Sequence, residues 1–104
     1  MIKRSVANAG KGWFTGPWQD DVPIALGYSD RGVDEPHLHE HMFEAYLVAR
    51  GTSSAVVAGE RIELGVGDVL IVEPGESHTF VESSPDYLHF VVQAPFVSGD
   101  KREG

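Results

Sequence analysis

The sequence contains no cysteine, few basic residues and no long apolar run, and each absence excludes a class of protein. Without cysteine the chain cannot form a disulfide framework, a thiolate zinc site or a cysteine nucleophile. With 8 basic against 16 acidic side chains, the formal net charge of −8 repels phosphates, so we expect no nucleic-acid partner. No apolar stretch approaches the roughly 20 residues that cross a bilayer, and the first residues lack a signal-peptide core. We therefore expect no membrane contact and a cytoplasmic location.

Helical periodicity is also missing. The 12 glycines and 6 prolines divide the chain into short pieces, and no dozen residues show apolar spacing of three and four. Short strands separated by glycine- and proline-rich turns predict an all-β fold, an antiparallel sandwich or small barrel. The 104 residues suffice for one domain with one core. The predicted strands are rich in β-branched and aromatic residues and cover 24–28, 38–40, 44–48, 54–58, 60–64, 69–72, 79–82 and 87–93. The residues Ala58-Gly59-Glu60 predict a tight hairpin between two of them.

Two of the predicted strands are apolar on both faces, at 69–72 and 90–92. A strand with one face in water would carry a polar residue at every second position. We therefore expect a cover on the outside of the sheet. The candidates are the N-terminal segment with Trp13, Phe14 and Trp18, a second sheet, or another subunit, which would make a homodimer. We favour this covering role for the three aromatic residues over a ligand cage.

Histidine is concentrated in one short segment, Pro36-His37-Leu38-His39-Glu40-His41. Positions i and i+2 of a strand point to the same face, so His37 and His39 can converge on one point. Glu44 follows His39 by an odd offset, so it joins them only if the chain bends or bulges around 40–43. Farther on, a turn over 73–78 delivers His78 to the start of a strand.

Three imidazoles and one carboxylate suit one divalent transition metal ion, which could be Mn, Fe, Co, Ni, Cu or Zn. In a six-coordinate ion this set leaves two positions for water or substrate, as metal catalysis requires. The alternative is that these are surface polar residues of a loop-rich barrel. We favour ligation because residue type, face and spacing agree. The predicted metal ligands are His37, His39, Glu44 and His78.

Other residues are candidates for the pocket around this site, although no catalytic residue is assigned. Tyr46 and Phe80 each follow a predicted ligand by two positions and should point into the same interior, mainly as packing residues. His41 is interpreted as a loop or pocket-rim residue and His89 as a hydrogen-bonded interior histidine. Glu73 is interpreted as a solvated turn residue rather than a second base.

The histidine segment resembles the first motif of the cupin superfamily: glycine, five residues, His-x-His, three or four residues, glutamate, six residues, glycine. His37 and His39, the spacing to Glu44 and the spacing from there to Gly51 match in full. Gly32 stands one residue closer to His37 than the motif asks.

The second cupin motif runs glycine, five residues, Pro-x-Gly, two residues, histidine, three residues, asparagine, and it resembles residues 67–82. Gly67, Gly75 and His78 keep their places. Glu73 stands where the motif has proline, and Glu82 where it has asparagine. These departures concern the turn and the pocket rim rather than ligation.

The resemblance implies a small single-domain cupin over 1–104, folded as a double-stranded β-helix. The motifs cover 32–51 and 67–82, and the segment 1–23 and the tail 98–104 are expected to be peripheral. Within those ends, 8–12 is expected to be a flexible connection and 98–104 a frayed tail. By the resemblance, His37, His39, Glu44 and His78 occupy the four metal-ligand positions.

The resemblance also implies metal-dependent chemistry on a small organic molecule, either of an oxygenase or of an isomerase or cyclase. The carboxylate at Glu44 disfavours the cysteine-dioxygenase-like branch, which lacks that ligand. The acidic surroundings of both motifs disfavour phosphorylated sugars. The alternatives are a binding or sensing module without turnover and a metal-stabilised structural dimer.

Overall fold

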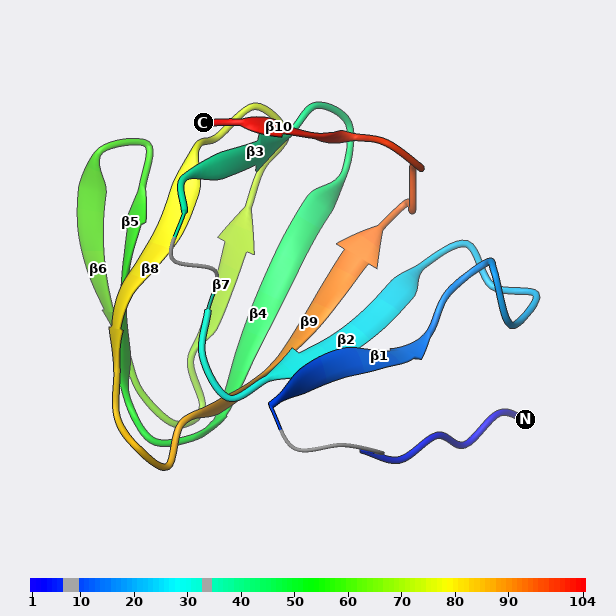
Figure 1. The fold of residues 1–104 in the computed structure, drawn as a ribbon, viewed down its shortest axis with the longest axis horizontal. Coiled ribbons are helices and arrows are strands. Elements are labelled where there is room, and N and C mark those ends of the chain that lie inside the picture. The colour runs from blue at the N-terminus through cyan, green and yellow to red at the C-terminus, as the bar shows by residue number, and fades with distance from the viewer. Residues whose placement is uncertain (7–9, 33–34) are drawn as a thin grey trace.

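The computed structural model describes residues 1–6, 10–32 and 35–104, which form ten β-strands and no helix (Figure 1). These residues accordingly contain no helix that could cross a membrane. The strands are β1 (Lys11–Thr15), β2 (Ala25–Ser29), β3 (His37–His39), β4 (Phe43–Arg50), β5 (Ser53–Val57), β6 (Glu60–Leu64), β7 (Val69–Val72), β8 (His78–Ser83), β9 (Leu88–Ala94) and β10 (Lys101–Glu103).

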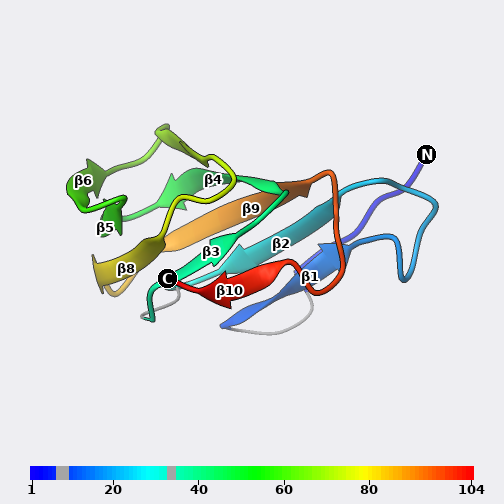
Figure 2. The ribbon, with the colours of Figure 1, turned by 90° about the horizontal axis from the view of Figure 1, so that it is seen from above.

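The strands make two five-stranded antiparallel sheets, in the orders β1-β2-β9-β4-β7 and β10-β3-β8-β5-β6. From β2 onward the chain changes sheet at every connection except the β5–β6 hairpin. In Figure 1 the first sheet runs diagonally, while β3 and β10 cross the top of the molecule; Figure 2 shows the same arrangement from above. This winding is the double-stranded β-helix that the resemblance to cupins implies.

The hydrophobic core lies between the inner faces of the two sheets. On β4, Tyr46 and Val48 are buried whereas Leu47 is exposed, which is the two-residue period of a strand. Burying each large side chain stabilises the fold by about 1.5–3 kcal/mol. The other buried members of the core are Ala55, Val57, Leu64, Val72, Phe80 and Tyr87.

The predicted hairpin is present between β5 and β6. Val57 pairs with Glu60, so the loop consists of Ala58 and Gly59, with φ angles of 49° and 82°. Two successive positive φ angles characterise the turn whose twist matches antiparallel strands.

The two glycines of the first motif occupy positions where a side chain does not fit. Gly51 has φ +71°, and a Cβ there would lie 2.9 Å from the Cα of Tyr87. A Cβ on Gly32 would overlap the ring of Phe80. Both positions therefore allow Phe80 and Tyr87 to fill the interior below the histidines.

The two ends of the chain form strands that the sequence does not predict. Gly12, expected in a flexible connection, lies in β1; Asn8 and Ala9 of that connection are outside the described residues. The prediction of a frayed tail over 98–104 is wrong, because β10 pairs with β3. β10 supplies hydrogen-bond partners to backbone groups of β3 that would otherwise lie at a sheet edge.

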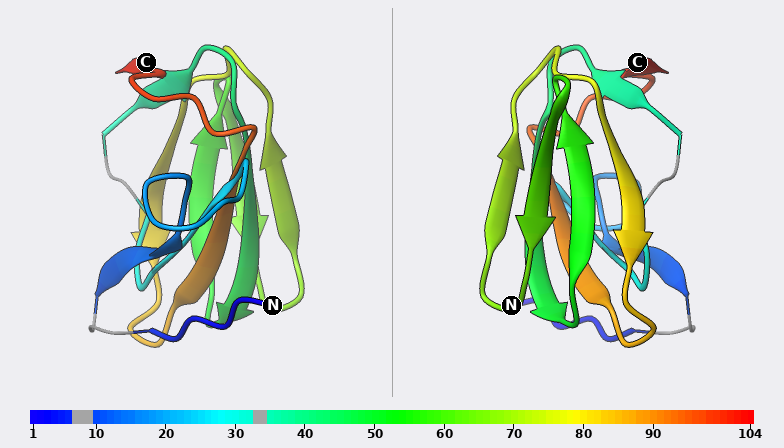
Figure 3. Two further views of the ribbon diagram at one scale, coloured as in Figure 1. Left: turned by 90° about the vertical axis from the view of Figure 1, so that its right-hand side faces the viewer. Right: turned by 90° about the vertical axis from the view of Figure 1, so that its left-hand side faces the viewer.

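The N-terminal aromatic residues cover only part of the first sheet. The ring centroid of Phe14 lies 5.0 Å from that of Tyr28 and 5.8 Å from that of Phe90. Trp13 and Trp18 pack edge to face and remain about half exposed, at 48% and 53%. Figure 3 shows the N-terminal segment at the end of the molecule opposite β3 and β10. The strand β7 is left without this cover.

Candidate metal centre

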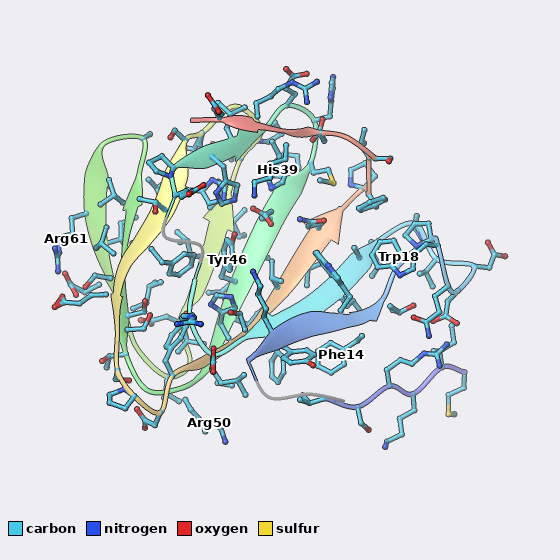
Figure 4. All side chains as sticks on the ribbon, in the orientation of Figure 1. Phe14, Trp18, His39, Tyr46, Arg50 and Arg61 are labelled. Carbon is cyan, nitrogen blue, oxygen red and sulfur yellow. The ribbon has the colours of Figure 1, made fainter. Side chains whose placement is uncertain are left out.

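The four predicted ligand residues meet at one end of the barrel interior. All four are buried, and each offers one ligand atom within 4.8 Å of those of the others. His37 and His39 come from β3, Glu44 from β4 and His78 from β8. This cluster of His37, His39, Glu44 and His78 could hold a metal ion. Figure 4 shows His39 close to the top of β4, above Tyr46.

The strand registers explain how distant residues meet. His37 pairs directly with His78 in the second sheet, while Glu44 lies in the first. Residues 40–42 carry the chain from one sheet to the other, which resolves the odd offset between His39 and Glu44. The bend expected around 40–43 is therefore the crossing between the sheets.

Backbone carbonyls orient two of the imidazoles. The Nδ1 atoms of His37 and His78 lie 3.1 Å from the carbonyl oxygens of Glu35 and Glu76, respectively. A carbonyl oxygen only accepts, so each Nδ1 carries the proton and each Nε2 is left with a lone pair. This is the arrangement by which a second contact fixes a metal-binding histidine.

The lone pair of His78 faces the carboxylate of Glu44. Its Oε1 lies 2.9 Å from Nε2 of His78 and 3.1 Å from Nε2 of His39. Nδ1 of His39 is buried and has no hydrogen-bond partner among the described residues, so its proton can reside on Nε2 and point at Glu44. His78 in its oriented tautomer has no proton to offer. Two buried acceptors that face each other are unfavourable unless a cation lies between them, and a metal ion meets that need.

The electrostatics favour an ionised Glu44 and a neutral His37. Burial raises the pKa of Glu44, but the hydrogen bonds that its carboxylate accepts, from His39 first, outweigh this effect and hold the pKa well below its usual range. Burial lowers the pKa of His37, which favours the neutral ring that a metal requires.

Below the cluster lies a column of aromatic and imidazole rings. The hydroxyl of Tyr46 lies 3.0 Å from Glu44 Oε1, and burial, followed by the negative charge of Glu44, raises the pKa of Tyr46 well above its ordinary value. Tyr46 therefore donates to Glu44. Its ring centroid lies 5.0 Å from those of both Phe80 and His89. The hydroxyl of Tyr87 contacts Nδ1 of His89 at 2.7 Å, and both residues are buried.

His41 does not join the four clustered residues. Its side chain is 68% exposed in the crossing between β3 and β4, with Nδ1 2.7 Å from Oδ1 of Asp100. Glu40, His41 and Asp100 form a separate cluster, in which Glu40 is also paired with Arg102. Glu73 is exposed in its turn.

Two residues near the cluster escaped the sequence analysis. Gln93 donates from Nε2 to Oε2 of Glu44 at 3.0 Å. The sequence does indicate this position, because Gln93 follows His89 by an even number of residues in an otherwise apolar strand and so points to the same interior face. Asp100, a buried carboxylate of the tail, carries no comparable signal.

A cavity of about 270 Å³ borders the cluster at His37. The tail contributes half of its lining, including the basic residues Lys101 and Arg102. The remaining lining residues are Glu35, Pro36 and Glu103.

Residues 28–93, more than half of the chain, match the cupin domain family. The chain belongs to the cupin family. No curated protein matches this cupin.

Solved structures share its fold. Streptomyces Pac13, described as a unique nucleoside dehydratase, is 20% identical with a TM-score of 0.77, over 100% of this chain and 91% of that one. A cupin from Bacteroides fragilis is 24% identical with a TM-score of 0.74, covering 99% and 88% of the two chains. KdgF from Halomonas sp. is 21% identical with a TM-score of 0.70, covering 93% and 89%. Variants of Pac13 have been solved with uridine.

Proposed function

We propose that this cupin binds one divalent transition metal ion through His37, His39, Glu44 and His78 and acts there on a small organic molecule. The observation that carries the proposal is the buried convergence of one carboxylate and three imidazoles from both sheets. The donor set of nitrogen and oxygen suits Mn, Fe, Co, Ni, Cu or Zn. A bound ion of this kind supplies Lewis-acid polarisation of a substrate oxygen.

The surrounding residues have roles that follow from their contacts. Glu44 stays ionised and offsets part of the charge of a divalent ion. Tyr46 keeps its proton and donates a hydrogen bond to Glu44, so its hydroxyl oxygen is left to accept a hydrogen bond from a substrate hydroxyl. His89 remains neutral because burial lowers its pKa to about 4, and its Nδ1 shares a hydrogen bond with the hydroxyl of Tyr87.

The size of the cavity supports a small substrate. Its volume of about 270 Å³ is just below the roughly 300–1,000 Å³ of small-molecule sites, and His37 is the member of the cluster that lines it. The structural neighbours that contain uridine also support a small organic ligand. Their low identity to this chain makes uridine one member of a substrate panel.

An open metal site is tested with cobalt and a bidentate oxygen ligand. We expect acetohydroxamate to shift the visible absorption bands of the Co²⁺-loaded protein and to saturate at one hydroxamate per cobalt, because four protein ligands leave two positions free. The E40Q variant, which changes an exposed carboxylate of the neighbouring cluster, should respond in the same way. An unchanged spectrum in the cobalt-loaded wild type would favour a closed site, as in a metal-stabilised structural protein.

The class of reaction is tested separately. The iron-loaded protein, reconstituted without oxygen, is mixed with candidate substrates, uridine included, and oxygen uptake and product formation are recorded. Uptake coupled to product supports an oxygenase. Product without uptake supports an isomerase, cyclase or dehydratase. Absence of turnover across metals and substrates would favour the binding or sensing alternative.

We further propose that the protein is a homodimer formed through the outer face of the first sheet. Leu47 pairs with both Val69 and Phe90, and these three neighbours are 37%, 56% and 37% exposed. Ile71, also on β7, is 60% exposed. Large contiguous apolar surfaces of this kind mark interfaces, and in a two-fold dimer the same face covers its own copy.

The dimer predicts a mass of twice the 11.3 kDa chain in light scattering at micromolar concentration. Replacing Ile71 with lysine should produce a monomer, because it places a charge inside the interface. Val81→Lys is the matched control, since Val81 is 50% exposed on the other sheet and should leave the mass unchanged. A monomeric wild type would refute the dimer.

A further inference from the structure

Asp100, in the C-terminal tail, has a buried carboxylate that contacts residues 58 and 59 positions earlier in the sequence. Its side chain is 1% exposed. One oxygen, Oδ2, accepts hydrogen bonds from the backbone N–H groups of His41 and Met42, both at 2.9 Å. The other, Oδ1, contacts Nδ1 of His41 at 2.7 Å. Both oxygens are therefore engaged by the same two consecutive residues.

These contacts hold the crossing between the two sheets. The backbone carbonyl of Asp100 also accepts from the N–H of Glu40 at 3.2 Å, so three successive amides over 40–42 bond to this one residue. The crossing separates His39 from Glu44. Its path decides whether Glu44 reaches the histidines, because a straight strand would send the two side chains to opposite faces.

The strand that follows Asp100, β10, pairs with β3, which carries His37 and His39. Lys101 pairs with His39 and Glu103 pairs with His37. Asp100 therefore lies at the junction of two attachments, one to the crossing and one to β3. Together they tie the tail to both sides of His39.

We propose that Asp100 is a positioning residue for the metal centre, which fixes the placement of Glu44 relative to His39 by holding the amides of residues 40–42. The proposal rests on the metal site proposed above. Asp100 acts through the backbone and does not itself bind the metal. Groups that orient metal ligands in this way typically change metal affinity by about 10–100-fold when removed.

The test measures Zn²⁺ affinity by isothermal titration calorimetry and the visible spectrum of the Co²⁺-loaded protein. We expect Asp100→Ala to weaken Zn²⁺ binding by about 10–100-fold and to alter the cobalt bands. Asp100→Asn, which keeps one acceptor oxygen, should restore part of the affinity. Asp21→Ala removes an exposed aspartate from the connection between β1 and β2 and should bind Zn²⁺ like the wild type.

A role in the fold alone predicts a different result. In that case Asp100→Ala would lower the melting temperature of the metal-free protein while its Zn²⁺ affinity and cobalt spectrum stay unchanged, and the proposal would be overturned. A second Zn²⁺ per chain that disappears in Asp100→Asn would also overturn it, since Asp100 would then be a ligand. If Asp100→Ala does not fold, Asp100→Asn decides: weaker binding supports the proposal and wild-type binding overturns it. Failure of the wild type itself to bind Zn²⁺ would instead refute the metal site.

Discussion

Replacement of His39 and His78 together with alanine should abolish stoichiometric metal binding. The double variant removes one ligand from β3 and one from β8, so only His37 and Glu44 remain of the cluster. Two protein ligands are too few for the closed donor set of a stable mononuclear site. The measurement is elemental analysis after dialysis, with one metal ion per chain expected in the wild type. His41→Ala, which removes an exposed histidine outside the cluster, should retain full metal content. Stoichiometric metal in the double variant would contradict the assignment.

The same variant should lose the stabilisation that metal provides. A ligand that binds only the folded state raises the free energy of unfolding by about 2.7 kcal/mol at a free concentration of 100 Kd. For a chain of this size that corresponds to a rise in Tm on the order of 10 °C. We expect this rise in the wild type on addition of Zn²⁺ and none in the double variant.

Acidification should destabilise the metal-free protein through His89. Burial lowers the pKa of His89 to about 4, although the negative charge of Glu44 partly opposes this effect. In the unfolded chain the pKa of a histidine is about 6.5. Between pH 6.5 and 4 the unfolded state therefore binds more protons, and the free energy of unfolding decreases as the pH falls. The expected loss from His89 is about 3 kcal/mol, complete below about pH 4.

Urea denaturation at a series of pH values in the presence of a chelator measures this effect. His37, whose pKa is also lowered by burial, and Glu44, whose pKa is held low, destabilise the fold in acid as well. The decisive quantity is therefore the difference between the wild type and His89→Gln. We expect the variant to lose less stability between pH 7 and 4 than the wild type. Equal losses would show that His89 does not titrate as its buried position implies.

The parts of the structure that the sequence predicts depend on local patterns. Alternation along a strand places His37 with His39 and Tyr46 with Glu44, and turn-forming residues mark the hairpin at Gly59. The convergence of the four clustered residues follows from these spacings and from the resemblance to cupins.

The parts that local patterns miss depend on contacts between distant segments. The strand Lys101–Glu103 consists of three charged residues without β-branched or aromatic side chains, so nothing in its composition indicates pairing with β3. Asp100 bonds to His41 across 59 positions, a contact that only the assembled fold creates. The strand around Ile71 is apolar on both faces, so the sequence predicts that its outer face is covered. In the dimer that we propose, a second copy of the chain supplies that cover.

The most direct test of the metal centre is a crystal structure of the Zn²⁺-loaded protein with anomalous diffraction data collected at the zinc absorption edge. We expect one strong anomalous peak per chain among His37, His39, Glu44 and His78, with bonds of about 2.0–2.2 Å to nitrogen and oxygen. The absence of a peak at these residues, or a peak only beside Glu40, His41 and Asp100, would contradict it.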